Sequence, residues 1–250
     1  MKTKVKTPEE IAFMRESGKL LATVLAMLKE AVQPGMSTKD LAEMAKRELR
    51  GTGGTPTFLG MYGFPDVICI SLNDEIVHGI PSPKRIIKEG DIVSLDFGVT
   101  YNGMITDSAT SVIVGQASPK IVNLVRDTKA SLYAGIQVLQ DGVQVGDVAN
   151  AIEQELKRGK YGIVRDMVGH GVGHELHEEP NIPNYGKSGT GPVLSAGMTI
   201  AIEPMATLGD FRVYIDIDGW TVRSNDRSLA AHFEHTVLIT ETGNEILTKL

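Results

Sequence analysis

The sequence predicts an α+β fold in which helices cover a curved antiparallel sheet. Helix-like segments alternate with strand-rich hairpins, without the regular strand–helix–strand crossovers that a parallel sheet requires. The order of helices followed by strands also occurs twice along the chain. These two observations predict two similar halves that share one sheet, whose open face would hold a functional site.

The repetition can be checked residue by residue. The stretch PGMSTKDLAEMAKREL at 34–49 aligns with DGVQVGDVANAIEQEL at 141–156. The same offset aligns EGDIVSLD, which ends at Asp96, with AGMTIAIE, which ends at Glu203. Both copies therefore place a carboxylate at the end of an apolar strand. Because an internal repeat indicates a shared structural unit, we expect one domain over 1–250 with pseudo-twofold halves at about 1–115 and 116–250.

Capping signals and helical periodicity define the first helix pair. Thr7-Pro8-Glu9-Glu10 combines an N-cap residue, a proline at the first helical position and a glutamate three residues after the cap. Apolar residues then recur at helical spacing until Pro34-Gly35. A second cap at Ser37 to Asp40 begins a shorter helix that should end at Gly51.

Strands follow the first helix pair, and the order then begins again. Residues 66–81 are rich in β-branched residues, and Asn102-Gly103 between two apolar runs predicts a two-residue type I′ hairpin. Ser118-Pro119 begins a third helix that ends before Asp141-Gly142, and the repeat supplies a fourth. The remaining residues read as strands and loops.

Composition limits the classes of protein to consider. The 250 residues are 42% apolar and 22% charged, and the formal charge of −6 argues against a surface built to hold nucleic acid. The single cysteine, Cys69, excludes a disulfide framework. The sequence shows neither a signal-peptide pattern nor an apolar segment long enough to span a bilayer. We therefore expect a cytoplasmic protein without membrane association.

Four carboxylates lie inside apolar strand-like runs. In a type I′ hairpin Asp96 faces Ala109 and Asp107 faces Gly98, which puts both aspartates on one face as diagonal neighbours. Glu203 and Glu234 are embedded similarly in the second half. A solvated face or ion pairs with basic residues would be the ordinary explanation, but these strands contain no lysine or arginine. Carboxylates gathered on a buried face repel, so a divalent metal is the expected counterion.

Histidines cluster in the segment DMVGHGVGHELHEEP. His170 and His174 have the spacing that chelates zinc on a helix, but the glycines between them make a helix improbable, and Glu175 is misplaced for that motif. The segment therefore reads as strand and loop. Oxygen ligands together with one imidazole suit a first-row metal such as Mn, Fe, Co or Zn. We expect Glu178 and Glu179 to be helix-start or surface carboxylates.

Five motifs in order resemble the type I methionine aminopeptidases, within the "pita-bread" metallopeptidases. They are NDEIVHGIP, GDIVSLDFGVTYNGMITDSA, VGHGVGHELHEEPNIPNY, GMTIAIEPM and HFEHTVLIT. Together with the first helices they cover nearly the whole chain. The resemblance implies the pita-bread (creatinase/aminopeptidase) fold and removal of the initiator methionine from chains with a small second residue, by two-metal activation of a bridging water.

The resemblance also implies roles for individual residues. Two divalent ions (Co, Mn, Fe or Zn) would be held by Asp96, Asp107, His170, Glu203 and Glu234, with Asp107 and Glu234 bridging both. Glu203 would also shuttle the proton. His78 and His177 would contact substrate near the scissile amide and its carbonyl oxygen. Phe64, Cys69 and Trp220 would line the methionine pocket, whereas His174, His232 and His235 would support the structure around the site.

The chain departs from the commoner family pattern at the pocket. Phe58, Met61 and Leu176 stand where other residues are usual, which affects the expected pocket shape and not the chemistry. We expect a monomer that acts on the N-termini of nascent polypeptides, with the ribosome as one setting and without direct nucleic-acid binding. Two alternatives remain open: a proline-directed aminopeptidase of the same fold, and a catalytically inactive pita-bread binding protein.

Overall fold

The computed structural model describes residues 5–250 as alternating helices and strands. The two longest helices, α1 and α3, each begin with a proline after a capping residue, as expected. In chain order the elements are α1 (Pro8–Ala31), α2 (Thr38–Glu48), β1 (Thr55–Pro56), the 3-10 turn η1 (Met61–Gly63), β2 (Cys69–Leu72), β3 (Glu75–Val77), β4 (Ile92–Tyr101), β5 (Met104–Ile113), α3 (Pro119–Gln137), α4 (Val145–Arg158), β6 (Gly162–Ile163), β7 (Gly169–Gly171), β8 (Glu178–Ile182), β9 (Thr199–Ile202), β10 (Met205–Thr207), β11 (Val213–Ile215), β12 (Val222–Ser224), β13 (Ala230–His232), β14 (His235–Thr240) and β15 (Gly243–Ile246).

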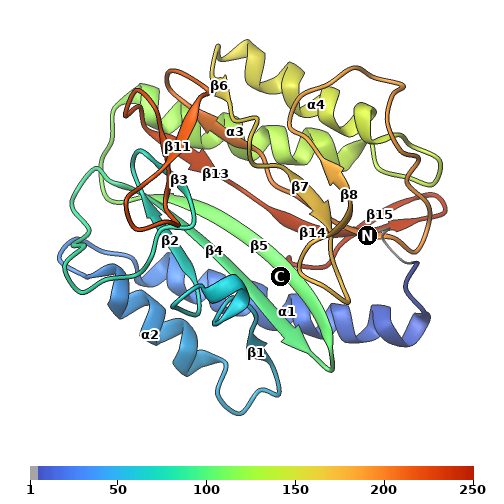
Figure 1. Cartoon of the computed structure of the whole chain (residues 1–250), viewed down its shortest axis with the longest axis horizontal. Coiled ribbons are helices and arrows are strands. Elements are labelled where there is room, and N and C mark those ends of the chain that lie inside the picture. Colours follow the sequence, from blue (N-terminus) through green and yellow to red (C-terminus); the bar gives the residue numbers. More distant parts are fainter. Residues whose placement is uncertain (1–4) are drawn as a thin grey trace.

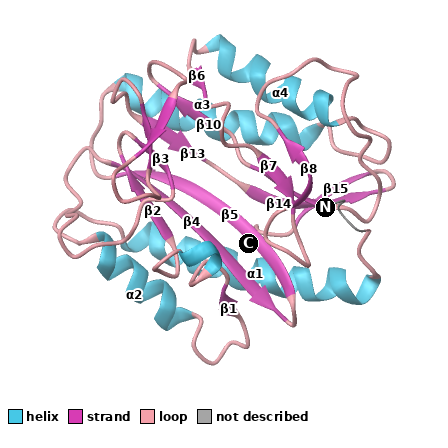
Figure 2. Cartoon of the chain, viewed as in Figure 1, coloured by secondary structure: helices cyan, strands magenta, loops and turns pink. Residues whose placement is uncertain are grey.

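The helices lie on two opposite sides of the strands. Figure 1 shows α1 and α2 together along one edge, α3 and α4 along the other, and the strands between them. Figure 2 shows the same division by element type. All named strand pairs are antiparallel, as the sequence predicts, and they form four hydrogen-bonded sheets. Among residues 5–250, no helix combines the length and the hydropathy needed to cross a membrane.

The β4–β5 hairpin has the predicted register. Asp96 pairs with Ala109 and Gly98 pairs with Asp107. Asn102 and Gly103 have φ values of 47° and 79°, which are the two positive angles that a type I′ turn requires. The turn therefore puts both aspartates on one face of the hairpin.

The internal repeat is visible as equivalent contacts in the two halves. The Gly35 N–H donates to the Ile87 carbonyl, and at the same offset the Gly142 N–H donates to the Leu194 carbonyl. The first turns match as well, because the Asp40 and Asp147 carboxylates accept the N-cap N–H groups of α2 and α4. The second helix ends at Glu48, slightly before the expected Gly51. These equivalent contacts agree with the repeat in the sequence.

The two halves meet where residues 107–109 of β5 lie against residues 234–236, a contact that we call the seam. The Glu234 N–H donates to the Ala109 carbonyl at 2.9 Å, and the Ala109 N–H donates to the Glu234 carbonyl at 3.3 Å. The Thr236 hydroxyl donates to the Asp107 carbonyl and accepts its N–H. The seam fixes a carboxylate of the first half beside a carboxylate of the second.

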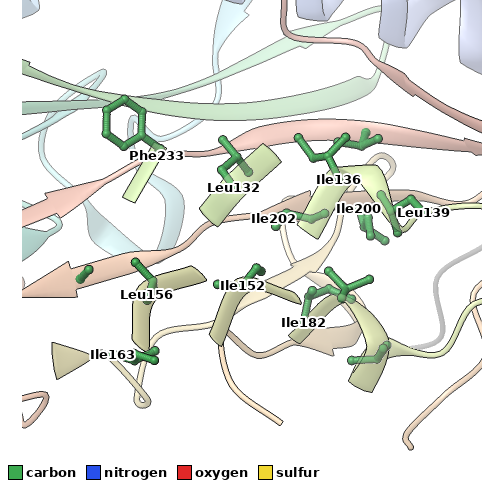
Figure 3. Packing of buried hydrophobic residues seen from close by; sticks show 14 of the residues in the cluster. Leu132, Ile136, Leu139, Ile152, Leu156, Ile163, Ile182, Ile200, Ile202 and Phe233 are labelled. Carbon is green, nitrogen blue, oxygen red and sulfur yellow. The ribbon is translucent and has the colours of Figure 1, made fainter. Parts of the chain in front are cut away.

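Each half has its own hydrophobic core. In the first half, α1 and α2 pack on β2 and β4 through residues such as Leu21, Leu41 and Leu95, all fully buried. In the second half, α3 and α4 pack on β9 and the strands beside it (Figure 3) through Leu132, Ile152, Leu156, Ile200 and Ile202. Packing on both sides makes the strands between the cores a stiff support for the side chains that they carry.

Candidate metal centre

A cavity of about 250 Å³ opens at the junction of the two halves. Its wall combines a cluster of ionisable side chains with an apolar section. Every residue that the sequence assigned to the site lies on this wall: Phe64, Cys69, His78, Asp96, Asp107, His170, His177, Glu203, Trp220 and Glu234. Residues far apart in the sequence thus converge on one pocket.

The four carboxylates come in equal numbers from the two halves. Asp96 lies on β4 and Asp107 on β5, while Glu203 follows β9 directly and Glu234 immediately precedes β14. Asp96, Asp107 and Glu234 are 9%, 5% and 2% exposed. Ionised groups at such depth require compensation by an opposite charge or by protonation.

His170 completes the cluster from β7, where it pairs with Ala201 of β9. Its Nε2 atom lies 3.6 Å from Glu203 Oε1. Its Nδ1 atom lies 2.9 Å from the Gly171 carbonyl oxygen, so a proton on Nδ1 leaves the Nε2 lone pair facing the carboxylates. Burial lowers the pKa of His170 to about 3, followed by the effect of the neighbouring His177, which keeps the ring neutral as a metal ligand must be.

The carboxylates lack the cations that their charge requires. Burial raises the pKa of Asp96 and of Glu234 well above the usual range, and the negative charge of Asp107 raises both further. Burial likewise raises the pKa of Glu203, followed by the charges of Asp96 and Asp107. Among residues 5–250, no lysine or arginine forms a salt bridge with any of these four groups. The cluster is thus electrostatically incomplete as protein alone.

The donor set fits a divalent metal. One ligand atom from each of Asp107, His170 and Glu234 lies within 4.8 Å of the others. Glu234 Oε1 is buried without a hydrogen-bond partner, which is costly unless a cation or another donor reaches it. Carboxylate oxygens with one imidazole nitrogen are ligands that first-row metals accept. The side chains therefore fit metal binding by the chemistry of their atoms as well as by position.

Two further histidines stand at the edge of the cluster. His78 follows β3 with a φ of 61°, an uncommon conformation for a residue with a side chain. Burial lowers the pKa of His78 to about 4, with a smaller effect from His177. His177 stacks on Tyr62 and meets the His170 ring edge-on at 4.5 Å between ring centres. Both imidazoles are neutral donors that can reach a ligand in the pocket.

The rest of the wall is apolar. Phe64 and Trp220 meet edge to face with 5.2 Å between ring centres. Cys69 lies opposite Asp96 in the β2–β4 pair, and burial raises the pKa of its thiol, so the thiol stays neutral. Phe58, Met61 and Leu176, the departures noted in the sequence, also line the cavity. Four further lining residues were not predicted, because they carry no chemical signal in the sequence beyond their position beside a motif: Tyr62, Val77, Met167 and Val168.

Two side chains beside the pocket have unusual surroundings. His232 is 1% exposed, and neither ring nitrogen has a hydrogen-bond partner, while its Nε2 atom lies 3.7 Å from Glu203 Oε2. Glu178 is not a surface or helix-start carboxylate as predicted: it lies in β8, is 7% exposed and pairs with Lys6. The alternation of strand β8 explains the error, because Glu178 faces inward and only Glu179 faces solvent.

A pocket of buried carboxylates and a neutral histidine on a two-half antiparallel framework is suited to hold a divalent metal, and comparison with known proteins gives the class, a metal-dependent hydrolase. The model of metallopeptidase family M24 matches residues 12–241. The chain belongs to this family.

Individual relatives are similar over nearly the full chain. A methionine aminopeptidase of Clostridium acetobutylicum is 43% identical over 244 residues, which cover 98% of this chain and 98% of the relative. The crystal structure of a methionine aminopeptidase from Thermotoga maritima matches with a TM-score of 0.98 and 44% identity, covering 99% of this chain and 100% of that one. A prolidase from Pyrococcus furiosus matches with a TM-score of 0.78 and 25% identity, covering 98% of this chain and 65% of that one. The pita-bread fold expected from the sequence is therefore confirmed.

Proposed function

We propose that this protein removes the N-terminal methionine from polypeptides whose second residue is small. The observation that carries the proposal is the shared wall of one cavity, where five metal-binding side chains adjoin an apolar compartment. Such a compartment suits an unbranched, apolar side chain like that of methionine. The similarity to methionine aminopeptidases over nearly the whole chain supports the same reaction.

The proposed ligands of two divalent ions are the five residues of the cluster. By resemblance to the methionine aminopeptidases, Asp107 and Glu234 would be shared by both ions, and a ligand atom of each lies within 4.8 Å of the other and of one from His170. Asp96 would complete the ligand set of one ion, and His170 with Glu203 that of the other. When bound, the ions would polarise the scissile carbonyl and lower the pKa of the attacking water. Mn, Fe, Co and Zn all suit these donors.

The protein's own side chains supply the remaining steps. Glu203, raised in pKa by burial and by its acidic neighbours, is suited to take a proton from water and to pass it towards the leaving amine. His177 is assigned to donate a hydrogen bond to the carbonyl oxygen as its negative charge develops, and His78 to contact the scissile amide. Since both imidazoles are neutral at pH 7, each offers an N–H without adding charge repulsion to the metal site.

The apolar compartment would determine the choice of the first residue. Phe64 and Trp220 form its aromatic wall and Cys69 contributes a neutral thiol. Phe58, Met61 and Leu176 narrow the same space. An uncharged, apolar side chain can enter such a space without the desolvation cost that a charged side chain would meet.

We further propose that residues 1–250 act as one catalytic domain, because the metal ligands come from both halves of the chain. The proposed setting is the cytoplasm, where a monomer meets the N-termini of nascent chains, including chains on the ribosome. A membrane or a nucleic acid has no role in the proposed reaction.

The test is hydrolysis of Met-Ala-Ser by metal-loaded protein, with a known methionine aminopeptidase as the positive control. Release of methionine is expected, and intact peptide under conditions where the control enzyme cleaves would refute the proposal. An Xaa-Pro peptide assayed in parallel identifies proline-directed activity, for which the prolidase-like fold is the only support. Metal analysis tests the alternative of an inactive binding protein, because such a protein would have no reason to hold two ions. Activity at controlled free Mn, Fe, Co and Zn then identifies the preferred metal.

A further inference from the structure

A fully buried ion pair joins the N-terminal segment to β8, the strand that follows the loop of residues 174–177. Lys6 Nζ lies 2.7 Å from Glu178 Oε2, and the two side chains are 0% and 5% exposed. Lysine is among the residues least often buried completely. A buried pair of this kind gives little net stability over an apolar pair, so its presence calls for a role other than holding the fold together.

The second carboxylate oxygen of Glu178 organises the loop before it. Glu178 Oε1 accepts the N–H of His174 at 2.7 Å and the N–H of Glu175 at 3.2 Å. The loop of residues 174–177 is therefore closed onto the residue at its own end. His177, which lines the cavity, is the last residue of this loop and the immediate neighbour of Glu178.

Contacts on either side fix the loop to the rest of the fold. The Gly173 carbonyl accepts the N–H of Ile105, two residues before Asp107 along β5. Glu10 of α1 lies 2.7 Å from His174 Nε2. The Lys6 N–H donates to the Gly197 carbonyl, which holds the N-terminal segment in place. A Cβ on Gly173 would lie 2.3 Å from Lys6 Cε, so the lysine stem fills the space beneath the loop.

From these contacts we infer that Lys6 and Glu178 act as positioning residues for His177. Lys6 orients the Glu178 carboxylate, and this carboxylate holds the loop N–H groups so that the His177 imidazole stays at the cavity wall. The inference rests on the proposed function for the role of His177 in the reaction. Loop closure by Glu178 stands independently of that role.

Two double variants separate hydrogen-bond acceptance from charge. Lys6→Met with Glu178→Gln removes both charges but retains an amide oxygen for the loop N–H groups. Lys6→Met with Glu178→Met removes the charges and the acceptor alike. Because neither variant leaves an unpaired buried charge, both avoid the main cause of unfolding at this position. Leu156→Ala in the α4 core serves as a control that destabilises the fold away from the loop.

The measurements are hydrogen exchange of the loop amides, metal binding, and kcat and KM on Met-Ala-Ser. With Glu178→Met we expect faster exchange of the His174 and Glu175 amides and a fall in kcat of roughly 10- to 100-fold. KM and the affinity for Mn²⁺ should stay nearly unchanged, because only the orientation of the His177 imidazole is lost. With Glu178→Gln only part of the activity should return, because the acceptor for the loop N–H groups is kept while the orienting lysine is absent. Leu156→Ala should leave kcat near the wild-type value below its unfolding temperature.

The inference is overturned if the Glu178→Met double variant keeps wild-type kcat, or if its loop amides exchange as slowly as in the wild type. Equal losses in the Gln and Met variants would also contradict it, because the acceptor would then be irrelevant. If the wild-type protein itself leaves Met-Ala-Ser intact while the loop amides respond as expected, the proposed function fails and loop closure by Glu178 stands.

Discussion

Replacing Asp107 with asparagine should stabilise the metal-free protein, and the effect should grow as the pH rises. Asp107 is 5% exposed, and burial raises its pKa to about 7 although it accepts a hydrogen bond from the Ser108 N–H. Asparagine has nearly the same shape and cannot ionise. The substitution therefore removes a charge that the metal-free fold does not compensate.

The size of the effect follows from the shift in pKa. In the native metal-free protein Asp107 retains its proton up to about pH 7, whereas in the unfolded chain it releases the proton near its ordinary pKa of 3.8. The folded state binds more protons between these values, so this contribution to stability is complete below about pH 4 and is lost as the pH rises to about 7. About three pH units at about 1.4 kcal/mol each amount to a loss on the order of 4 kcal/mol. Asparagine suffers no such loss.

The neighbouring carboxylates add to the same trend, because burial and then acidic neighbours, including the charge of Asp107, raise the pKa of Asp96, Glu203 and Glu234, and asparagine removes the effect of that charge. The histidines contribute equally to both proteins. Burial lowers the pKa of His78, His170, His232 and His235, so each of these histidines makes the native state more stable as the pH rises towards 6.5. Both proteins contain all four histidines, and the difference between the variant and the wild type cancels their contribution.

The assay is urea unfolding followed by far-UV circular dichroism, with a chelator present, at about pH 4.5, 6 and 8. The free energy of unfolding of the Asn variant should exceed that of the wild type by an increment that widens with pH. With saturating Mn²⁺ the order should reverse, because only the ionised carboxylate binds the cation and ligand binding stabilises the native state. A difference that stays constant from pH 4.5 to 8 without metal would refute the reasoning.

Three further outcomes are expected. Gly103→Ala should lower the free energy of unfolding by about 1 kcal/mol, because φ is 79° there and nothing lies within 4 Å of the added Cβ; an unchanged urea midpoint would contradict the type I′ turn. His232→Leu should weaken Mn²⁺ binding roughly 10-fold in calorimetry, whereas His232→Gln should restore most of the affinity through its amide donor beside Glu203; equal affinities in the two variants would show that no such donor is needed. Phe58→Ala should widen the cavity, lowering kcat/KM for an N-terminal methionine relative to a bulkier first residue; an unchanged ratio would exclude Phe58 from substrate selection.

Sequence analysis predicted the positions of the two aspartates because short-range rules determine them. Asn102-Gly103 sets the turn type, the turn type sets the register, and the register puts Asp96 and Asp107 on one face. The repeat predicted that Asp96 and Glu203 both end strands, but Asp96 lies within β4 because the strand continues to the Asn102-Gly103 turn, whereas Glu203 directly follows β9. A site residue can be predicted from the sequence when the residues that position it lie within a few positions of it, or when it recurs at the fixed offset of the repeat.

Predictions failed where burial depends on a distant segment. Glu178 and Glu179 are adjacent acidic residues, and their sequence neighbours do not indicate which of the two faces inward. The partner that makes burial of Glu178 possible is Lys6, which lies 172 positions earlier in the chain. Tyr62 and Met167 line the cavity for the same reason, since the convergence of separate loops puts them there. The unpartnered nitrogens of His232 also become visible only when every neighbour is known.

The seam has a consequence for how the protein reaches its native state. Asp107 and Glu234 are held together by bonds between segments separated by most of the second half of the chain. Contacts so distant in sequence form late, because the entropy of closing a long loop opposes them until the local structure on both sides exists. A ribosome-bound chain that has not yet exposed residue 234 therefore lacks Glu234 and cannot complete the cluster. Metal binding that depends on Glu234 is therefore expected only after nearly the whole chain has been synthesised.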